Sequence, residues 1–90
     1  MGLIVCRHIV IHWRYYRLDK MKPELRELGS RIRRYRNKLG ISQEELADRS
    51  GLHRTYVGGV ERGERNIGVL NLLRIANALK IPPGRLLLNK

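Results

Sequence analysis

The segment His53–Tyr56, HRTY, carries side chains that could read the bases of a nucleic acid. An arginine such as Arg54 can donate two hydrogen bonds to O6 and N7 of guanine, and a threonine such as Thr55 offers a hydroxyl and a methyl group to thymine. A plain phosphate contact is the alternative for Arg54. For His53 we favour a capping or surface role over a phosphate contact. These residue types at the start of a short helix indicate binding in the major groove of DNA.

The patterns that mark an enzyme or a metal site are missing from the sequence. Carboxylates are not clustered at metal-site spacing, and no nucleophile is paired with a base. Cys6, His8 and His12 lie within seven residues of one another. A structural zinc site needs four ligands, however, and only His53, which lies in the DNA-facing motif, remains to complete the set. We therefore expect no catalytic residues, no metal and no cofactor.

The motif Ser42–Asn66, SQEELADRSGLHRTYVGGVERGERN, must position the reading side chains. Ser42 and Glu45 form the S-x-x-E pattern of a capping box, which predicts a helix at Gln43–Arg49. Gly51 follows where the turn needs a positive φ, which a residue with a Cβ adopts only at a cost. The sequence thus predicts a capped helix and a tight turn ahead of the reading helix.

The reading helix itself is predicted to begin at residue 53 or 54 and to end at residue 61 or 62. Gly58 and Gly59 cost about 1 kcal/mol each relative to alanine inside a helix, so tertiary contacts must hold this helix. The absence of side chains there would let another backbone approach closely. Six residues fall at the packing positions of a helix-turn-helix, counted from Gln43. They are Leu46, Ala47, Gly51, Leu52, Val57 and Val60.

Three further helices complete the predicted fold. The first runs from residue 23 or 24 to residue 38, and Gly40 ends it. Its apolar stripe consists of Leu25, Leu28, Ile32, Tyr35 and Leu39. The other two are predicted at about Val69–Lys80 and Gly84–Leu88. The sequence therefore indicates an all-α domain of five helices within residues 21–90.

The last two helices carry more apolar side chains than one core requires. The residues that match an inward stripe at 69–80 are Leu70, Leu73, Ile75, Ala76 and Leu79, with Leu72 in addition. Leu86, Leu87 and Leu88 are consecutive, so they cannot all point into one core. One reading helix covers only a few base pairs, so specificity needs two copies on half-sites about one helical turn apart. We expect a homodimer with Leu72, Leu86 and Leu88 at its interface.

The charge of the chain favours a polyanion as partner. Its 90 residues make one small domain, and their formal net charge is +11. A solubilising surface is the alternative explanation of this charge. The single cysteine, Cys6, excludes an intramolecular disulfide and suits a reducing cytosol, and no apolar run approaches the ~20 residues of a membrane span. We expect a cytoplasmic protein that binds double-stranded DNA and no membrane.

Residues 1–20 differ in character from the rest of the chain. They are rich in β-branched and aromatic residues, and Ile9, Ile11, Trp13 and Tyr15 alternate as on one face of a strand. We expect a non-helical or disordered extension outside the domain of residues 21–90. Three interpretations stay open: the extension pairs with its copy in a dimer, it packs as a loose arm, or Met21 is the natural start.

From about Glu24 to Leu88 the chain resembles the Cro/C1-type helix-turn-helix family, also called the XRE family. Within it, the segment Leu52–Asn66, LHRTYVGGVERGERN, is similar to the controller proteins of restriction-modification systems, which are small dimeric regulators with five helices. The resemblance implies a five-helix, lambda-repressor-like DNA-binding domain. It does not cover residues 1–20.

The resemblance also implies roles for individual side chains. The residues that would meet DNA bases are Arg54, Thr55 and Tyr56, the last of these at a base edge or the backbone. Those that would bind phosphates are Gln43, Arg65, Asn66 and Asn71.

Arg36 and Glu61 match a buried ion pair, for which two independent surface charges are the alternative. Glu44 and Asp48 fall where some activators of the family offer acidic residues to the σ subunit of RNA polymerase. Gly59 departs from members with a reading side chain there, which puts more weight on DNA shape.

Taken together, these features predict a transcriptional regulator that binds a pseudo-palindromic operator as a homodimer. By the same resemblance it would act in a controller-like manner and regulate its own promoter. An antitoxin of a toxin–antitoxin pair, which would also bind its own promoter, is the alternative. No ligand-binding domain is visible in the sequence, so we expect no small-molecule effector.

Overall fold

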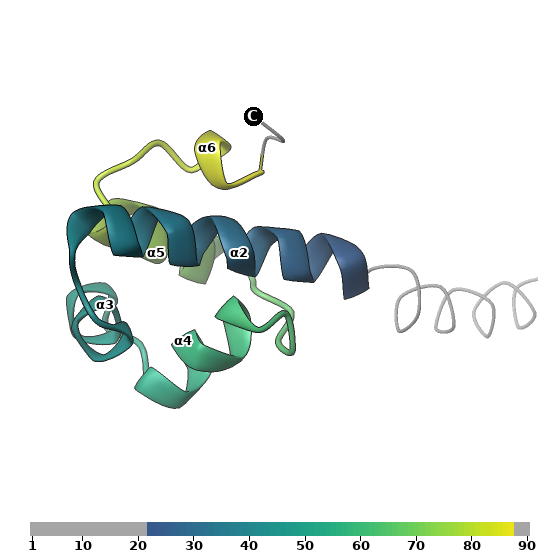
Figure 1. Cartoon of the computed structure of the whole chain (residues 1–90), viewed down its shortest axis with the longest axis horizontal. Helices are drawn as coiled ribbons and strands as arrows, with labels where there is room; N and C mark the ends of the chain where they lie inside the picture. The colour runs from purple at the N-terminus through teal and green to yellow at the C-terminus, as the bar shows by residue number, and fades with distance from the viewer. Residues whose placement is uncertain (1–21, 88–90) are drawn as a thin grey trace, which may run out of the picture.

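The computed structural model describes residues 22–87, which fold as five helices without a strand among them (Figure 1). The helices are α2 (Lys22–Leu39), α3 (Gln43–Ser50), α4 (Arg54–Glu61), α5 (Val69–Ala78) and α6 (Gly84–Leu87). The prediction of an all-α, five-helix domain is confirmed. The expected extension at residues 1–20 lies outside the described residues, as does Leu88.

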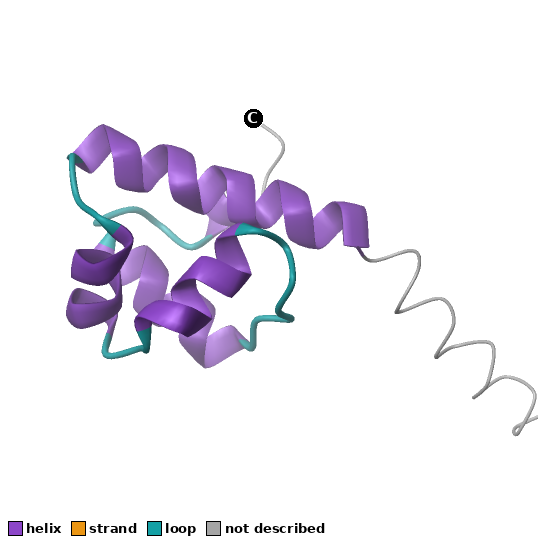
Figure 2. Ribbon diagram, turned by 60° about the horizontal axis from the view of Figure 1, so that its bottom comes forward, coloured by secondary structure: helices purple, strands orange, loops and turns teal. Residues whose placement is uncertain are grey.

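The long helix α2 lies across the others, with α3 and α4 below it and α5 behind it in the view of Figure 1. It packs against α4 and α6, whereas α3 packs against α4 and α5. On the predicted apolar stripe of α2, Leu28 and Ile32 are buried, and Tyr35 packs against the core from the side. The helix-turn-helix formed by α3 and α4 therefore lies against the long helix α2, which runs above it in Figure 2.

The start of α3 follows the local chemistry of its sequence. The Glu45 backbone N–H donates to Ser42 Oγ at 3.0 Å, and Gly51 ends the helix with a φ of 71°. The second half of the predicted capping box differs, because the Glu45 carboxylate accepts a 2.6 Å hydrogen bond from Arg49 one turn later. One reciprocal bond is therefore replaced by an ion pair along the helix.

The core is centred on the packing positions of the helix-turn-helix. Leu46, Ala47, Val57 and Val60 are buried, and Leu52 packs against them from the turn. The buried side chains that complete this core from the rest of the domain are Leu28, Ile32, Ile41, Leu72, Ile75, Ala76, Ala78, Leu79 and Leu86. Because α4 places its valines inward, the exposed residues of this helix are those of its first turn, Arg54 and Thr55.

Helix α5 buries a different stripe from the one expected. Leu70 and Leu73 are 71% and 43% exposed, while Leu72 is buried together with Ile75 and Leu79. Residues 72, 75, 76 and 79 follow the spacing of one helical face, and that face meets the core. The inward assignment of Leu70 and Leu73 was wrong because the run VLNLL is apolar on both sides.

The predicted interface residues Leu72 and Leu86 lie in the core of a single copy. Leu72 is 8% exposed and Leu86 is fully buried, so neither offers appreciable surface to a second chain. Assigning these two residues to an interface is therefore corrected by their burial. The large apolar side chains that do face solvent in the described region are Leu39, Val69, Leu70, Leu73 and Leu87.

Two local features set how the helices end and cross. Helix α5 ends at Ala78 rather than Lys80, because Lys80 adopts the left-handed conformation with a φ of 61°. Within α2, a Cβ added at Gly29 would lie 2.3 Å from the Val60 carbonyl oxygen and 2.5 Å from that of Glu61. The α2 and α4 backbones therefore touch at Gly29, a contact that sequence reasoning did not identify.

Candidate nucleic-acid interface

The outward side of α4 begins with two side chains that have the chemistry to read bases. Arg54 and Thr55 are exposed in the first turn, while the inward residues Val57 and Val60 fix the rotation of the helix. His53 stands exposed at the N-cap position and its side chain makes no capping hydrogen bond, so of the two predicted roles the surface role describes its side chain. The structure thus presents Arg54 and Thr55 on a helix whose orientation the core determines.

A buried ion pair fixes this helix to the rest of the domain. Arg36 Nε lies 2.7 Å from Glu61 Oε2, and Arg36 Nη2 donates to Glu61 Oε1 at 3.1 Å. The two side chains are only 11% and 2% exposed, which excludes two independent surface charges. Arg36 Nη1 also donates to the Ile41 carbonyl oxygen at 2.9 Å, so the same guanidinium holds the turn between α2 and α3.

The first residue of α3 belongs to the same network. Gln43 Nε2 donates a 2.9 Å hydrogen bond to Glu61 Oε1. The amide nitrogen carries a second hydrogen, and the backbone N–H at the first position of a helix has no partner within that helix. Gln43 is therefore held in place by Glu61 while keeping donors for a phosphate group.

A second tie joins α4 to the start of α5. Asn71 Nδ2 donates to the Tyr56 hydroxyl at 3.1 Å, and both residues are half-buried. Because the tyrosine oxygen accepts this bond, its own hydrogen stays free to be donated elsewhere. Tyr56 and Asn71, which were assigned separate DNA contacts, are thus brought together at one place.

The loop that follows α4 supplies further cations. Arg62, Arg65 and Asn66 are exposed, and a Cβ added at Gly59 would lie 2.7 Å from Arg65 Cγ. A Cβ at Gly58 would lie 3.2 Å from Arg62 Nη1. The space above the two glycines is therefore occupied by arginine side chains, and not by an approaching backbone as the sequence suggested.

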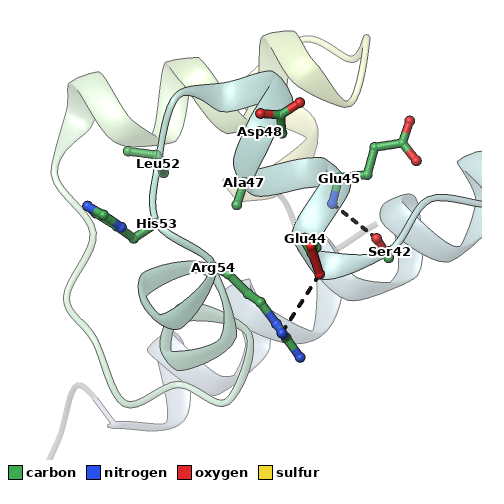
Figure 3. Close-up of a pocket in the computed structure, with 8 residues that line it drawn as sticks. All are labelled: Ser42, Glu44, Glu45, Ala47, Asp48, Leu52, His53 and Arg54. Atoms are coloured by element: carbon green, nitrogen blue, oxygen red, sulfur yellow. Dashed lines mark hydrogen bonds and ion pairs between the residues drawn. The ribbon is translucent and has the colours of Figure 1, made fainter.

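Acidic side chains line a shallow pocket between α3 and the start of α4. Figure 3 shows Glu44, Glu45 and Asp48 around it, with Arg54 extending toward Glu44. Arg54 Nη1 lies 3.8 Å from Glu44 Oε2, and both side chains are largely exposed. The pocket also contains Ser42, Ala47, Leu52 and His53. It places an acidic surface directly beside the predicted reading residues.

Residues 22–87 contain neither a metal-ligand cluster nor a helix that could span a membrane. In that region His, Cys, Asp and Glu side chains form no group of three that could hold a metal ion. Helices there are also too short or too polar to span a bilayer. The cluster of Cys6, His8 and His12 lies outside the described residues.

The chain is similar in sequence to a helix-turn-helix family and to control proteins of bacteria. Residues 32–86 match a family model described as helix-turn-helix. Control protein C.SmaI of Serratia marcescens is 50% identical over 60 residues, which cover 67% of this chain and 71% of that protein. Control protein C.BamHI of Bacillus amyloliquefaciens is 43% identical over 60 residues, covering 66% of this chain and 74% of that protein.

Solved structures show the same likeness in three dimensions. The restriction-modification controller protein C.AhdI from Aeromonas hydrophila matches with a TM-score of 0.71 and 52% identity, over 71% of this chain and 97% of that chain. A hypothetical transcription factor from Neisseria, NHTF, matches with a TM-score of 0.69 and 44% identity, over 71% of this chain and 72% of that chain. At these identities the likeness is one of family and not of fold alone.

Proposed function

Because the chain belongs to the Cro/C1-type helix-turn-helix family and is closely related to restriction-modification controller proteins, we propose that it binds a pseudo-palindromic operator as a homodimer. In this proposal it regulates transcription from its own promoter, in the manner of a controller. The family and its relatives make the chain a DNA-binding transcriptional regulator rather than an enzyme. The dimeric, operator-specific and autoregulatory parts are our proposal.

The fixed orientation of α4 is the observation that carries the proposal. Arg54 and Thr55 are exposed on one side of a helix whose other side is tied to α2 by the Arg36–Glu61 ion pair. A rigid helix backbone presents its side chains to the bases in a defined position, which favours sequence-specific contacts. We infer that these two residues contact bases, with Tyr56 beside them.

Polar and basic residues before and after the reading helix α4 support the proposal that this region binds DNA phosphates. Gln43 lies at the start of α3, and the loop after α4 carries Arg65 and Asn66. Asn71 lies in the first turn of α5 and is bonded to Tyr56. Phosphate contacts of this kind set the register of a protein on DNA without reading its sequence. We infer that the four residues bind the backbone on either side of the bases.

Exposed apolar side chains support a dimer. Val69, Leu70 and Leu73 face solvent on α5, and Leu87 does so on α6. Large apolar side chains left exposed together on a small domain are candidates for an interaction site. We propose that this surface replaces Leu72 and Leu86 as the contact between two copies.

Selection of bound duplexes from random DNA tests the proposal. We expect enriched sequences to contain two inverted half-sites whose centres lie about one helical turn apart. Footprinting of the DNA upstream of the coding sequence should then protect a matching site. Enrichment of a single unrepeated half-site would contradict the dimeric operator, and no enrichment would contradict sequence-specific binding.

The acidic surface beside the reading helix supports a contact with RNA polymerase. We propose that Glu44 and Asp48 face the σ subunit when the protein activates transcription. Asp48 is the cleaner test, because Glu44 is paired with Arg54. Asp48→Asn should lower activated transcription several-fold while leaving operator occupancy unchanged. Equal loss of occupancy and transcription would show that Asp48 acts through DNA binding instead.

A further inference from the structure

Arg62 lies on the same side of α4 as the predicted reading residue. Arg54, Gly58 and Arg62 follow one another at four-residue steps, and side chains on a helix lean toward its N-terminus. The position of a Cβ on Gly58 would be 3.2 Å from Arg62 Nη1 and 3.5 Å from Gln43 Oε1. The guanidinium of Arg62 therefore rests on bare helix backbone, beside a residue proposed to bind phosphate.

An acidic side chain of the same loop occupies one edge of this guanidinium. Arg62 Nε lies 3.1 Å from Glu64 Oε2, with the side chains 57% and 61% exposed. An arginine binds a phosphate through the same planar N–H edges that bind a carboxylate. A DNA phosphate and Glu64 would therefore compete for Arg62.

The turn that carries Glu64 is fixed by the fold. Gly63 has a φ of 76°, and a Cβ there would lie within 2.9 Å of three Arg26 atoms, two of them backbone. The Gly63 N–H donates to the Val60 carbonyl oxygen at 3.0 Å, and the Glu64 N–H donates to that of Gly59 at 2.9 Å. The packed turn thus fixes the backbone that carries Arg62 and Glu64 close together, while their side chains stay exposed.

We propose that Arg62 binds a phosphate of the DNA backbone and that Glu64 competes with this phosphate, so that Glu64 lowers DNA affinity. The proposal rests on the DNA-binding function inferred above. An exposed ion pair is weak enough to be exchanged for a phosphate contact. Removing the Glu64 charge should therefore tighten binding by about two- to fivefold per half-site.

A double-mutant cycle on two DNA duplexes tests this exchange. Binding of the full chain would be measured by fluorescence anisotropy from about 0.05 to 0.3 M salt, on a selected operator and on a random duplex of equal length. The variants are Glu64→Gln, Arg62→Gln and their combination. Glu45→Gln is the matched control, because it removes the same charge from another exposed pair, 2.6 Å from Arg49. Thermal unfolding checks that each variant is folded.

The expected result has three parts. Glu64→Gln tightens binding to both duplexes by more than Glu45→Gln does. Arg62→Gln weakens binding to both duplexes and lowers the salt slope by about one per contact. In the Arg62→Gln background, the gain from Glu64→Gln falls to that of the control, because the guanidinium for which Glu64 and the phosphate compete is gone.

Several outcomes would overturn the proposal. A gain equal to that of Glu45→Gln, or one that persists without Arg62, would mean that Glu64 acts only through net charge. An unchanged salt slope in Arg62→Gln would show that Arg62 does not contact a phosphate of the DNA backbone. If the native chain binds the random duplex and the operator with equal affinity, the proposal of operator recognition is wrong. The double-mutant cycle on the random duplex would still show whether Glu64 competes with phosphate for Arg62. Binding to neither duplex would refute both.

Discussion

The carboxylate of Glu61 accepts hydrogen bonds from two helices other than its own. Arg36 reaches it from α2 and Gln43 reaches it from α3, all within 3.1 Å. Breaking a buried ion pair is costly because one charge is left in the interior without a partner. At the scale of single residues, Glu61 is therefore the point on which the position of the reading helix depends.

Replacing Glu61 with alanine should strongly destabilise the domain. The Arg36 guanidinium would remain buried without its carboxylate, and we expect a loss of about 3–5 kcal/mol in the free energy of unfolding. Denaturant unfolding followed by circular dichroism measures this loss. Glu64→Ala is the control: its pair with Arg62 is exposed, so its effect should stay below about 1 kcal/mol. Similar losses in both variants would contradict a structural role specific to Glu61.

Replacing Arg54 with alanine should relax base preference at one operator position. We expect a cost of about 1–3 kcal/mol on the preferred base, because a bidentate contact is lost. Arg49→Ala removes the same charge from an exposed pair on α3, with no reading contact assigned, and should leave the preference intact. Binding-site selection with both variants measures this difference. An unchanged preference in Arg54→Ala would favour the plain phosphate contact.

At the scale of the elements, the helix starts and turns could be predicted because their signals are local. Ser42 caps α3 and Gly51 ends it, as each residue type alone suggests. The phase of α5 could not be predicted, because Val69, Leu70, Leu72 and Leu73 offer two apolar faces and only the neighbouring helices select one. The positions of the Arg62 and Arg65 side chains over Gly58 and Gly59 could not be predicted either, because they depend on the path of the loop that follows α4.

Gly29 shows a tertiary contact that left a weak mark in the sequence. A glycine inside a helix costs about 1 kcal/mol relative to alanine, so its presence in an otherwise good helix suggests a packing reason. That reason is the backbone of α4 at Val60 and Glu61. A glycine at this position suggests that another part of the chain packs closely there, but only the fold shows which part it is.

Replacing Gly29 with alanine should destabilise the domain although alanine favours helix. The new Cβ would meet two backbone carbonyls that cannot move aside separately, so we expect a net loss of about 1–3 kcal/mol. Ser30→Ala, at the adjacent exposed position of α2, should change stability by no more than about 0.5 kcal/mol. Thermal unfolding of both variants measures the difference. A stabilised Gly29→Ala variant would show that α2 and α4 can separate at no cost.

At the scale of the whole molecule, the exposed apolar side chains of α5 and α6 test the proposed dimer. Replacing Leu73 with serine should raise the dimer dissociation constant by about tenfold or more and leave the monomer folded. Leu39→Ser is the control, since Leu39 is exposed to a similar extent at the end of α2. Sedimentation measures the dissociation constant.

The buried neighbour of Leu73 gives the contrasting case. Leu72→Ser should unfold the chain itself, at a cost of about 2–5 kcal/mol, because Leu72 belongs to the core. Unchanged association of Leu73→Ser would place the dimer contact elsewhere on the surface. Circular dichroism separates loss of folding from loss of association in both variants.

The exposure of Arg54 and Thr55 separates the side chains that we propose to read DNA from those that keep the chain folded. Neither residue belongs to the core, and the only ion pair described for Arg54, with Glu44, is itself exposed to solvent. Recognition can therefore diverge by substitution at these two positions without loss of the scaffold. Duplicated copies of such a gene could acquire new operators independently, and a library randomised at these positions should yield regulators of equal stability that do not cross-react.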